Sequence, residues 1–192
     1  MLLAHDHSEL DAASGALFSA LADEDVERSF KNLDLFWARL AMHIRAENIH
    51  LFPILLKASR RSGKAAEVPA LETVEEIIAQ LRADHDFFMS ELTAAMKQLR
   101  ELRRSDRHDA APVLAKVRGQ MTRLRRRFHT HNALEESQAY HWAGALLASP
   151  EQTALKERLQ RELDNLPPRF RAAGWSAAQG PGPNEQRHCG VT

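Results

Sequence analysis

The stretch LAMHIRAENIHLFPIL, residues 40–55, carries two ionisable residues inside an apolar helical stripe. Read as a helix, it places Leu40, Ile44 and Leu51 toward one side, and His43 and Glu47 fall on that same side, one turn apart. An uncompensated carboxylate in a protein core costs several kcal/mol. The pattern therefore raises the question of what compensates Glu47.

The same design occurs twice along the chain. The His-x-x-x-Glu pair of residues 43 and 47 recurs as His131 and Glu135, each with an aromatic residue five positions after the Glu. An Asp-His dipeptide in the preceding helix ends at His7 in the first half and at His85 in the second. Two helical hairpins related by a pseudo-twofold axis would bring four imidazoles and two carboxylates together: His7, His43, Glu47, His85, His131 and Glu135.

Six such groups in a core need cations. Imidazole and carboxylate ligands suit first-row metals such as iron, manganese or zinc. Two ions would offset the two carboxylates; each would receive two histidines, and Glu47 and Glu135 could bridge them. A coordination position would stay open, as a reactive or binding site requires.

The elements that must position these residues are helices, because helical periodicity runs through almost the whole chain. The expected fold is all-α: an antiparallel four-helix bundle with a short extra C-terminal helix and a disordered tail. We expect a domain over residues 1–165, with its core in 1–148, and a Pro/Gly-rich tail over 166–192. The expected helices span about 2–22, 24–60 (kinked at Pro53), 71–103, 112–148, and from the N-cap Ser149 to about 165.

Composition narrows the function. Lys+Arg and Asp+Glu balance at 26 each, which gives no electrostatic footprint for nucleic acid or an acidic membrane surface. The single cysteine, Cys189, excludes a disulfide framework or a thiolate metal site. The first residues do not resemble a signal peptide, and no apolar run approaches the ~20 residues of a membrane span. We expect a cytoplasmic protein.

At the six paired residues the sequence resembles the hemerythrin-like (HHE cation-binding) family, over roughly residues 1–148. The resemblance implies a four-helix bundle that holds two iron ions in a non-haem di-iron centre, bridged by two carboxylates and an oxygen. It also implies a small diatomic or peroxide ligand.

Two departures separate this chain from the oxygen-carrying hemerythrins. Those have a second histidine in the helix that corresponds to residues 71–103, where this chain has Met89. They also have an Asp five residues after the histidine of the helix that corresponds to residues 112–148, where this chain offers Glu135 and Glu136. The missing imidazole argues against simple reversible oxygen carriage. The pattern is more similar to di-iron proteins implicated in repairing iron–sulfur centres under nitrosative or oxidative stress.

Other polar residues near the stripe are expected outside the centre. His5, His129 and Glu136 fall on polar faces, and Asp6 and Asp84 should face solvent or a neighbouring helix, because sequence neighbours on a helix point about 100° apart. The arginines of RLRRRFHTH, residues 123–131, are interpreted as a solvated helix face. His50, two turns from His43, could be an extra ligand, a hydrogen-bond donor to a ligand, or part of a ligand channel.

Two classes of function remain. One is a binding or sensing module for oxygen, nitric oxide or peroxide in an oxidative or nitrosative stress response. The other is a di-iron enzyme, or an iron donor that repairs iron–sulfur centres.

Overall fold

The computed structural model describes residues 2–62, 69–104 and 110–171, and all regular structure within those ranges is helical. None of the described helices is long and apolar enough to cross a bilayer. In chain order the elements are α1 (Leu2–Ala22), α2 (Val26–Ala46), the π-helical turn η1 (Glu47–Leu51), α3 (Phe52–Ser62), α4 (Leu71–Arg104), α5 (Ala110–Leu134), the π-helical turn η3 (Glu135–Ala139), α6 (Tyr140–Leu146), α7 (Ser149–Leu163) and α8 (Pro168–Arg171).

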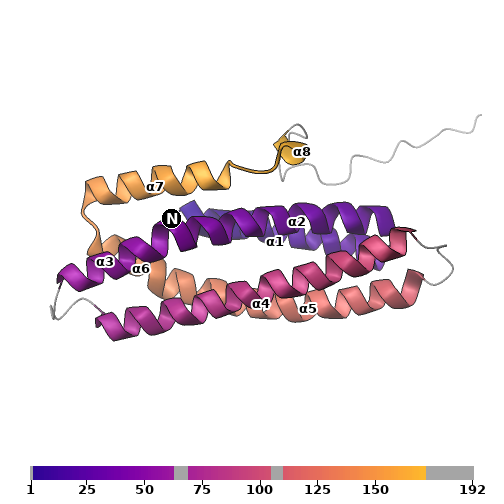
Figure 1. The fold of residues 1–192 in the computed structure, drawn as a ribbon, viewed down its shortest axis with the longest axis horizontal. Coiled ribbons are helices and arrows are strands. Elements are labelled where there is room, and N and C mark those ends of the chain that lie inside the picture. Colours follow the sequence, from indigo (N-terminus) through magenta and orange to yellow (C-terminus); the bar gives the residue numbers. More distant parts are fainter. Residues whose placement is uncertain (1, 63–68, 105–109, 172–192) are drawn as a thin grey trace, which may run out of the picture.

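Four long helical rods form the bundle (Figure 1). In chain order they are α1; α2 with η1 and α3; α4; and α5 with η3 and α6. Helices α1 and α2 make one hairpin and α4 and α5 the other, and the hairpins meet through contacts of α2 with α4 and of α1 with α5. The turn between α1 and α2 ends at Asp25, whose carboxylate accepts the Arg28 amide hydrogen at 2.9 Å and so caps α2. The predicted all-α four-helix bundle is confirmed.

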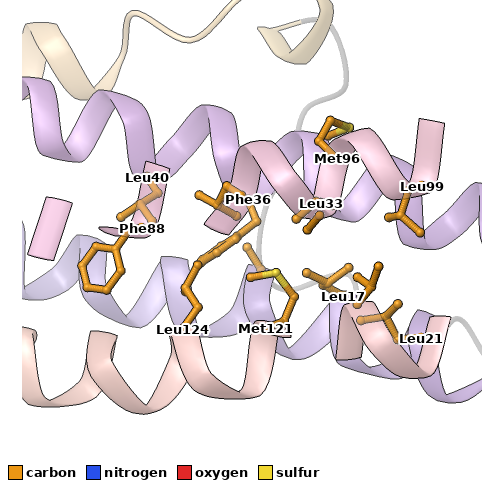
Figure 2. Close-up of a cluster of buried hydrophobic side chains, with 14 of the residues drawn as sticks. Leu17, Leu21, Leu33, Phe36, Leu40, Phe88, Met96, Leu99, Met121 and Leu124 are labelled. Carbon is orange, nitrogen blue, oxygen red and sulfur yellow. The ribbon is translucent and has the colours of Figure 1, made fainter. Parts of the chain in front are cut away.

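The core consists of two apolar clusters, one toward each end of the bundle. The first, shown in part in Figure 2, contains Leu17, Leu33, Phe36, Phe88 and Leu124 among others. The second contains Leu3, Leu51, Phe52, Ile78 and Trp142 among others. Along every long rod the predicted site residues fall in sequence between members of the two clusters, so a polar layer divides the core.

The second and fourth rods each contain one π-helical turn, which the sequence analysis did not anticipate. Each begins at the glutamate of the His-x-x-x-Glu pair: the amide of Phe52 donates to the Glu47 carbonyl, and that of Tyr140 to the Glu135 carbonyl. Pro53 was expected to kink the second rod, but the fourth rod has the same turn without a proline. In a regular helix a residue five positions on lies about 140° away around the axis. The wider π turn places both aromatic residues above the glutamates.

The C-terminal elements lie outside the four rods. Helix α7 packs on α1, α2 and η1. It begins at Ser149, and Ala148 is the N-cap residue. Pro150 is the second residue of the helix. The prediction that Ser149 is the N-cap is therefore wrong by one residue. Helix α8 falls in the segment predicted as tail, and Arg169 binds both Asp34 oxygens, at 2.9 and 2.8 Å. The rest of the predicted disordered tail, residues 172–192, lies outside the described residues, and the domain boundary stays a prediction.

The π turn of η1 holds one residue more than an α turn, so we expect deletion of Ile49 to be tolerated. Phe52 would then follow Glu47 by four positions and stay on the inward face of a regular helix. The expected loss of unfolding free energy is below about 2 kcal/mol, within the range of ordinary substitutions, measured by denaturation followed by circular dichroism.

Deletion of Ala94, an exposed residue of regular α4, is the control. It rotates the inward residues Met96 and Leu99 by about 100° and should cost more than about 4 kcal/mol or prevent folding. Equal losses in the two variants would show that η1 contains no spare residue.

Candidate metal centre

The structure brings all six predicted site residues together in the polar layer between the two apolar clusters. His7 comes from α1, His43 from α2 and His85 from α4, and all six are buried, Glu47 and Glu135 completely at 0% exposure. They form two groups capable of holding a cation: His7, His43 and Glu135 in one, and Glu47, His85, His131 and Glu135 in the other. Their role as ligands stays a prediction.

Each glutamate carboxylate lies between two pairs of histidines, His7 with His43 and His85 with His131. Glu47 directs Oε1 toward His43 Nε2, at 3.5 Å, and Oε2 toward His85 Nε2, at 3.2 Å. Glu135 directs Oε2 toward His7 Nε2, at 3.2 Å, and Oε1 toward His131 Nε2, at 2.9 Å. A carboxylate with one oxygen at each of two imidazole pairs has the arrangement needed to bridge two ions.

Three atoms of the second group are placed to bind a cation, and they are not placed to form hydrogen bonds with one another. Glu47 Oε2, His85 Nε2 and Glu135 Oε1 are fully buried and have no hydrogen-bond partner among the described residues, although the close contacts above surround them. A buried polar atom without a hydrogen bond costs about 1–3 kcal/mol. Nitrogen and oxygen atoms that converge without hydrogen-bond geometry offer their lone pairs to a common point, as coordination of a cation requires.

Two aspartates orient the imidazoles of the second and fourth rods. His43 donates through Nδ1 to Asp6 Oδ2 at 2.8 Å, and His131 donates through Nδ1 to Asp84 Oδ2 at 3.2 Å. A carboxylate at Nδ1 fixes the proton there and leaves the Nε2 lone pair free to face the centre, as second-shell partners of metal-bound histidines do. The centre therefore has an outer layer of carboxylates.

An arginine supports each of these aspartates. Arg39 lies 3.4 Å from Asp6 Oδ1, and Arg127 donates to Asp84 Oδ1 at 2.6 Å. Each arginine precedes its histidine by four residues, so the second rod of each hairpin carries Arg-x-x-x-His-x-x-x-Glu. This longer repeat in the sequence marks the two arginines, which were not among the predicted site residues.

Asp6 and Asp84 were expected to face solvent or a neighbouring helix, and the second alternative holds. Both are buried and bind a site histidine of the neighbouring helix, a contact that was not expected. Arg127, expected on a solvated face, has a side chain that is 40% exposed yet is paired with Asp84. A 100° separation along one helix does not stop an aspartate from reaching the histidine of the adjacent helix.

His7 and His85 have outer partners of a different kind. His7 donates through Nδ1 to Glu136 Oε1 at 2.8 Å, and the Asn48 amide lies 3.3 Å from His85 Nδ1. A cation at His85 Nε2 requires a proton on Nδ1, which the Asn48 amide oxygen can accept after a 180° rotation. Glu136 lies at the surface as predicted, with its side chain 49% exposed, but its contact with His7 was not anticipated.

Burial and pairing compete in setting the charges of the layer. Burial is the largest single influence and disfavours the charged forms of His43 and Glu47, but the surrounding charges and hydrogen bonds together outweigh it. Glu47, Asp6 and Glu135 raise the pKa of His43 well above its ordinary value, and His43 and His85 lower the pKa of Glu47 well below its ordinary value. Glu135 likewise raises the pKa of His131 despite burial. Without a cation, imidazolium–carboxylate pairs therefore balance the layer, and a metal would replace those protons.

Tyr140 is a seventh member of the cluster that the sequence analysis treated only as an aromatic repeat partner. Its hydroxyl lies 2.9 Å from Glu47 Oε1, 3.1 Å from Glu135 Oε2 and 3.1 Å from His7 Nε2. The single hydroxyl hydrogen can be donated to one carboxylate at a time. Burial and both carboxylates raise the pKa of Tyr140 well above its ordinary value, so the phenol stays protonated.

The equivalent position in the other half is Phe52, which stacks on His85 at a ring separation of 5.8 Å. The two halves are thus alike in the histidines and glutamates of the layer but differ in the Tyr140 hydroxyl and in the outer partners Glu136 and Asn48. The sequence signal for this difference is the residue five positions after each glutamate, Phe in one half and Tyr in the other.

The remaining histidines near the stripe do not join the described cluster. His5 is exposed, and His129 lies 3.8 Å from Asp11 at the surface. His50 belongs to neither cation-capable group, and its Nε2 faces Glu162 of α7 at 3.5 Å. Met89 packs against the first apolar cluster.

Comparison with known proteins agrees with this geometry. No curated protein and no solved structure matches the chain. A family model, the hemerythrin HHE cation binding domain, matches residues 2–143, from the first residue of α1 into α6. This range contains all six residues of the polar layer together with their outer partners. The chain belongs to the hemerythrin HHE cation-binding family.

Proposed function

We propose that the polar layer holds two iron ions in a non-haem centre that binds or reacts with oxygen, nitric oxide or peroxide. His7 and His43 would hold one ion and His85 and His131 the other, with Glu47 and Glu135 shared. The observation that carries the proposal is the convergence of four Nε2 atoms on two buried carboxylates, each of which faces both histidine pairs. Family membership supports a cation, and the nitrogen–oxygen ligand set suits iron.

The bound pair would supply redox chemistry toward small oxidants, and the chain would supply the surroundings. Asp6 and Asp84 hold two imidazoles in one tautomer, and the apolar clusters on both sides exclude water from the layer. The Tyr140 hydroxyl is placed to donate a hydrogen bond at the His7 side. We further propose a role in the response to oxidative or nitrosative stress.

Metal content tests the ligand assignment. We expect about two irons per chain in protein purified with iron, and loss of metal in His43→Ala and in His131→Ala, because each substitution removes an imidazole that converges on the layer. His5→Ala and His129→Ala are matched controls and should keep their iron, since both side chains lie at the surface. Retention of full iron by His131→Ala, with loss in His129→Ala, would refute the assignment; elemental analysis and the near-ultraviolet spectrum supply the measurement.

The outer carboxylates should matter nearly as much as the ligands. We expect Asp84→Asn to weaken iron binding by about 10–100-fold, because an amide no longer fixes the proton on His131 Nδ1 and weakens the pairing with Arg127. Asp86→Asn changes an exposed carboxylate two residues away and should bind iron like the parent protein. Competition with a chromophoric chelator measures both affinities, and equal values for the two variants would contradict the role of Asp84.

Reactivity distinguishes this chain from an oxygen carrier. With only one histidine from α4, neither ion is saturated by protein ligands, so we expect the reduced, iron-loaded protein to oxidise rapidly in air and to respond to peroxide or nitric oxide. Met89→His should slow oxidation if its imidazole reaches the layer from one turn beyond His85. Stopped-flow spectra provide the measurement. A spectrum that forms in oxygen and reverses on deoxygenation would instead indicate oxygen storage.

A further inference from the structure

A cavity of about 710 Å³ lies between the start of α1, α6 and α7. Its buried wall is apolar and includes Ala143, Leu147, Leu155 and Leu159. Helix α7, which lies outside the four rods in Figure 1, supplies Leu155 and Leu159 to this wall, and its exposed residues open the cavity to solvent. The cavity therefore exists because α7 is added to the bundle.

Its size does not match a diatomic ligand. A water molecule, comparable in size to oxygen or nitric oxide, takes about 30 Å³ in the liquid, so the cavity exceeds such a ligand about twentyfold. Sites for organic molecules have volumes of about 300–1,000 Å³ and mostly apolar walls with a few polar groups. The dimensions fit an organic molecule.

Tyr140 connects this cavity to the polar layer. The residue lines the cavity, while its hydroxyl lies 2.9 Å from Glu47 and 3.1 Å from Glu135. A molecule in the cavity would thus contact a side chain that itself touches both carboxylates.

The charge of Lys156 at the rim of the cavity indicates which kind of organic molecule the cavity would bind. Lys156 is the one charged residue among the described residues that line the cavity, and its side chain is exposed. The neighbouring Gln152 amide is already engaged, because it donates to the carbonyls of Gly144 and Leu147 at 3.1 and 2.8 Å. An apolar wall with one ammonium group at its edge complements an amphipathic anion.

We propose that this cavity binds a small amphipathic carboxylate, with its apolar chain against Leu155 and Leu159 and its carboxylate at Lys156. Occupancy would be communicated to the polar layer by contact with Tyr140. The binding site stands on the cavity alone, whereas its effect on the layer rests on the iron centre proposed above.

Decanoate is the probe, titrated into the iron-loaded full chain by isothermal calorimetry. We expect saturable binding of one decanoate, and no saturable binding of decylammonium, which has the same chain and the opposite charge. Equal binding of the two would overturn the assignment of a carboxylate, and absence of decanoate binding would overturn the site.

Gly144→Leu tests the location. Gly144 lines the cavity and a Cβ there meets no atom within 4 Å, so the leucine can enter the space without disturbing α6. Gly119→Leu is the matched control, since Gly119 also has open space around it but lies at an exposed position of α5, outside the cavity. We expect loss of decanoate binding in the first variant only. Unchanged binding by a folded Gly144→Leu variant would refute the site.

Lys156→Gln tests the charge. Loss of a charge-assisted contact should weaken decanoate binding about tenfold, whereas Lys97→Gln, an exposed lysine of α4, should have no effect. Equal affinities of the two variants would refute the carboxylate orientation.

Tyr140→Phe tests the connection. The variant keeps the ring that lines the cavity and loses the hydroxyl, so decanoate should still bind while the shift that it causes in the iron absorption spectrum disappears. A parent spectrum unchanged by saturating decanoate would refute the connection. Iron content is measured separately and decanoate binding is repeated on metal-free chain, so a failure of the iron centre is distinguished from a failure of the cavity site.

Discussion

The burial of two carboxylates between four imidazoles is the interaction on which the rest of this structure depends. Glu47 and Glu135 are completely buried, and burial alone would strongly disfavour their charges. The imidazoles around them lie at ion-pair distance and, when protonated, supply compensating charge, and two apolar clusters close the layer from both ends of the bundle. The four rods are thus held together by ordinary hydrophobic packing, while the polar layer fixes their register, because a shift of one rod would leave a carboxylate unpaired.

The repeat in the sequence becomes an approximate symmetry of charge around this layer. In each half an arginine supports an aspartate, the aspartate orients a histidine on the neighbouring rod, and the histidine faces a shared glutamate. The polar network therefore extends from the surface to the centre along two equivalent paths. Such a network holds the Nε2 atoms in position for a cation. This arrangement costs free energy unless a cation or protons occupy the layer.

The symmetry ends at the two π turns. Both place an aromatic side chain above a glutamate, but Tyr140 brings a hydroxyl to the His7 side, and Phe52 brings only a ring to His85. Tyr140 also lines the cavity beside α7, whereas Phe52 is not among the residues that line it. Together with Glu136 at His7 and Asn48 at His85, Tyr140 gives the two ends of the layer different chemistry, and it gives one end contact with the cavity between α1, α6 and α7.

The sequence by itself determined the four long rods, the bundle and the six residues of the layer, because apolar periodicity and the repeated His-x-x-x-Glu spacing are local properties of the chain. Tertiary structure alone decided the rest. Asp6 and Asp84 act on histidines of other helices, so their direction relative to their own sequence neighbours did not reveal their partners. The π turns depend on packing that favours an inward Phe52 and Tyr140 over ideal hydrogen bonds. The cavity depends on where α7 docks. The 15 residues of α7 are mostly polar, so its own sequence does not determine its position without the bundle surface that it covers.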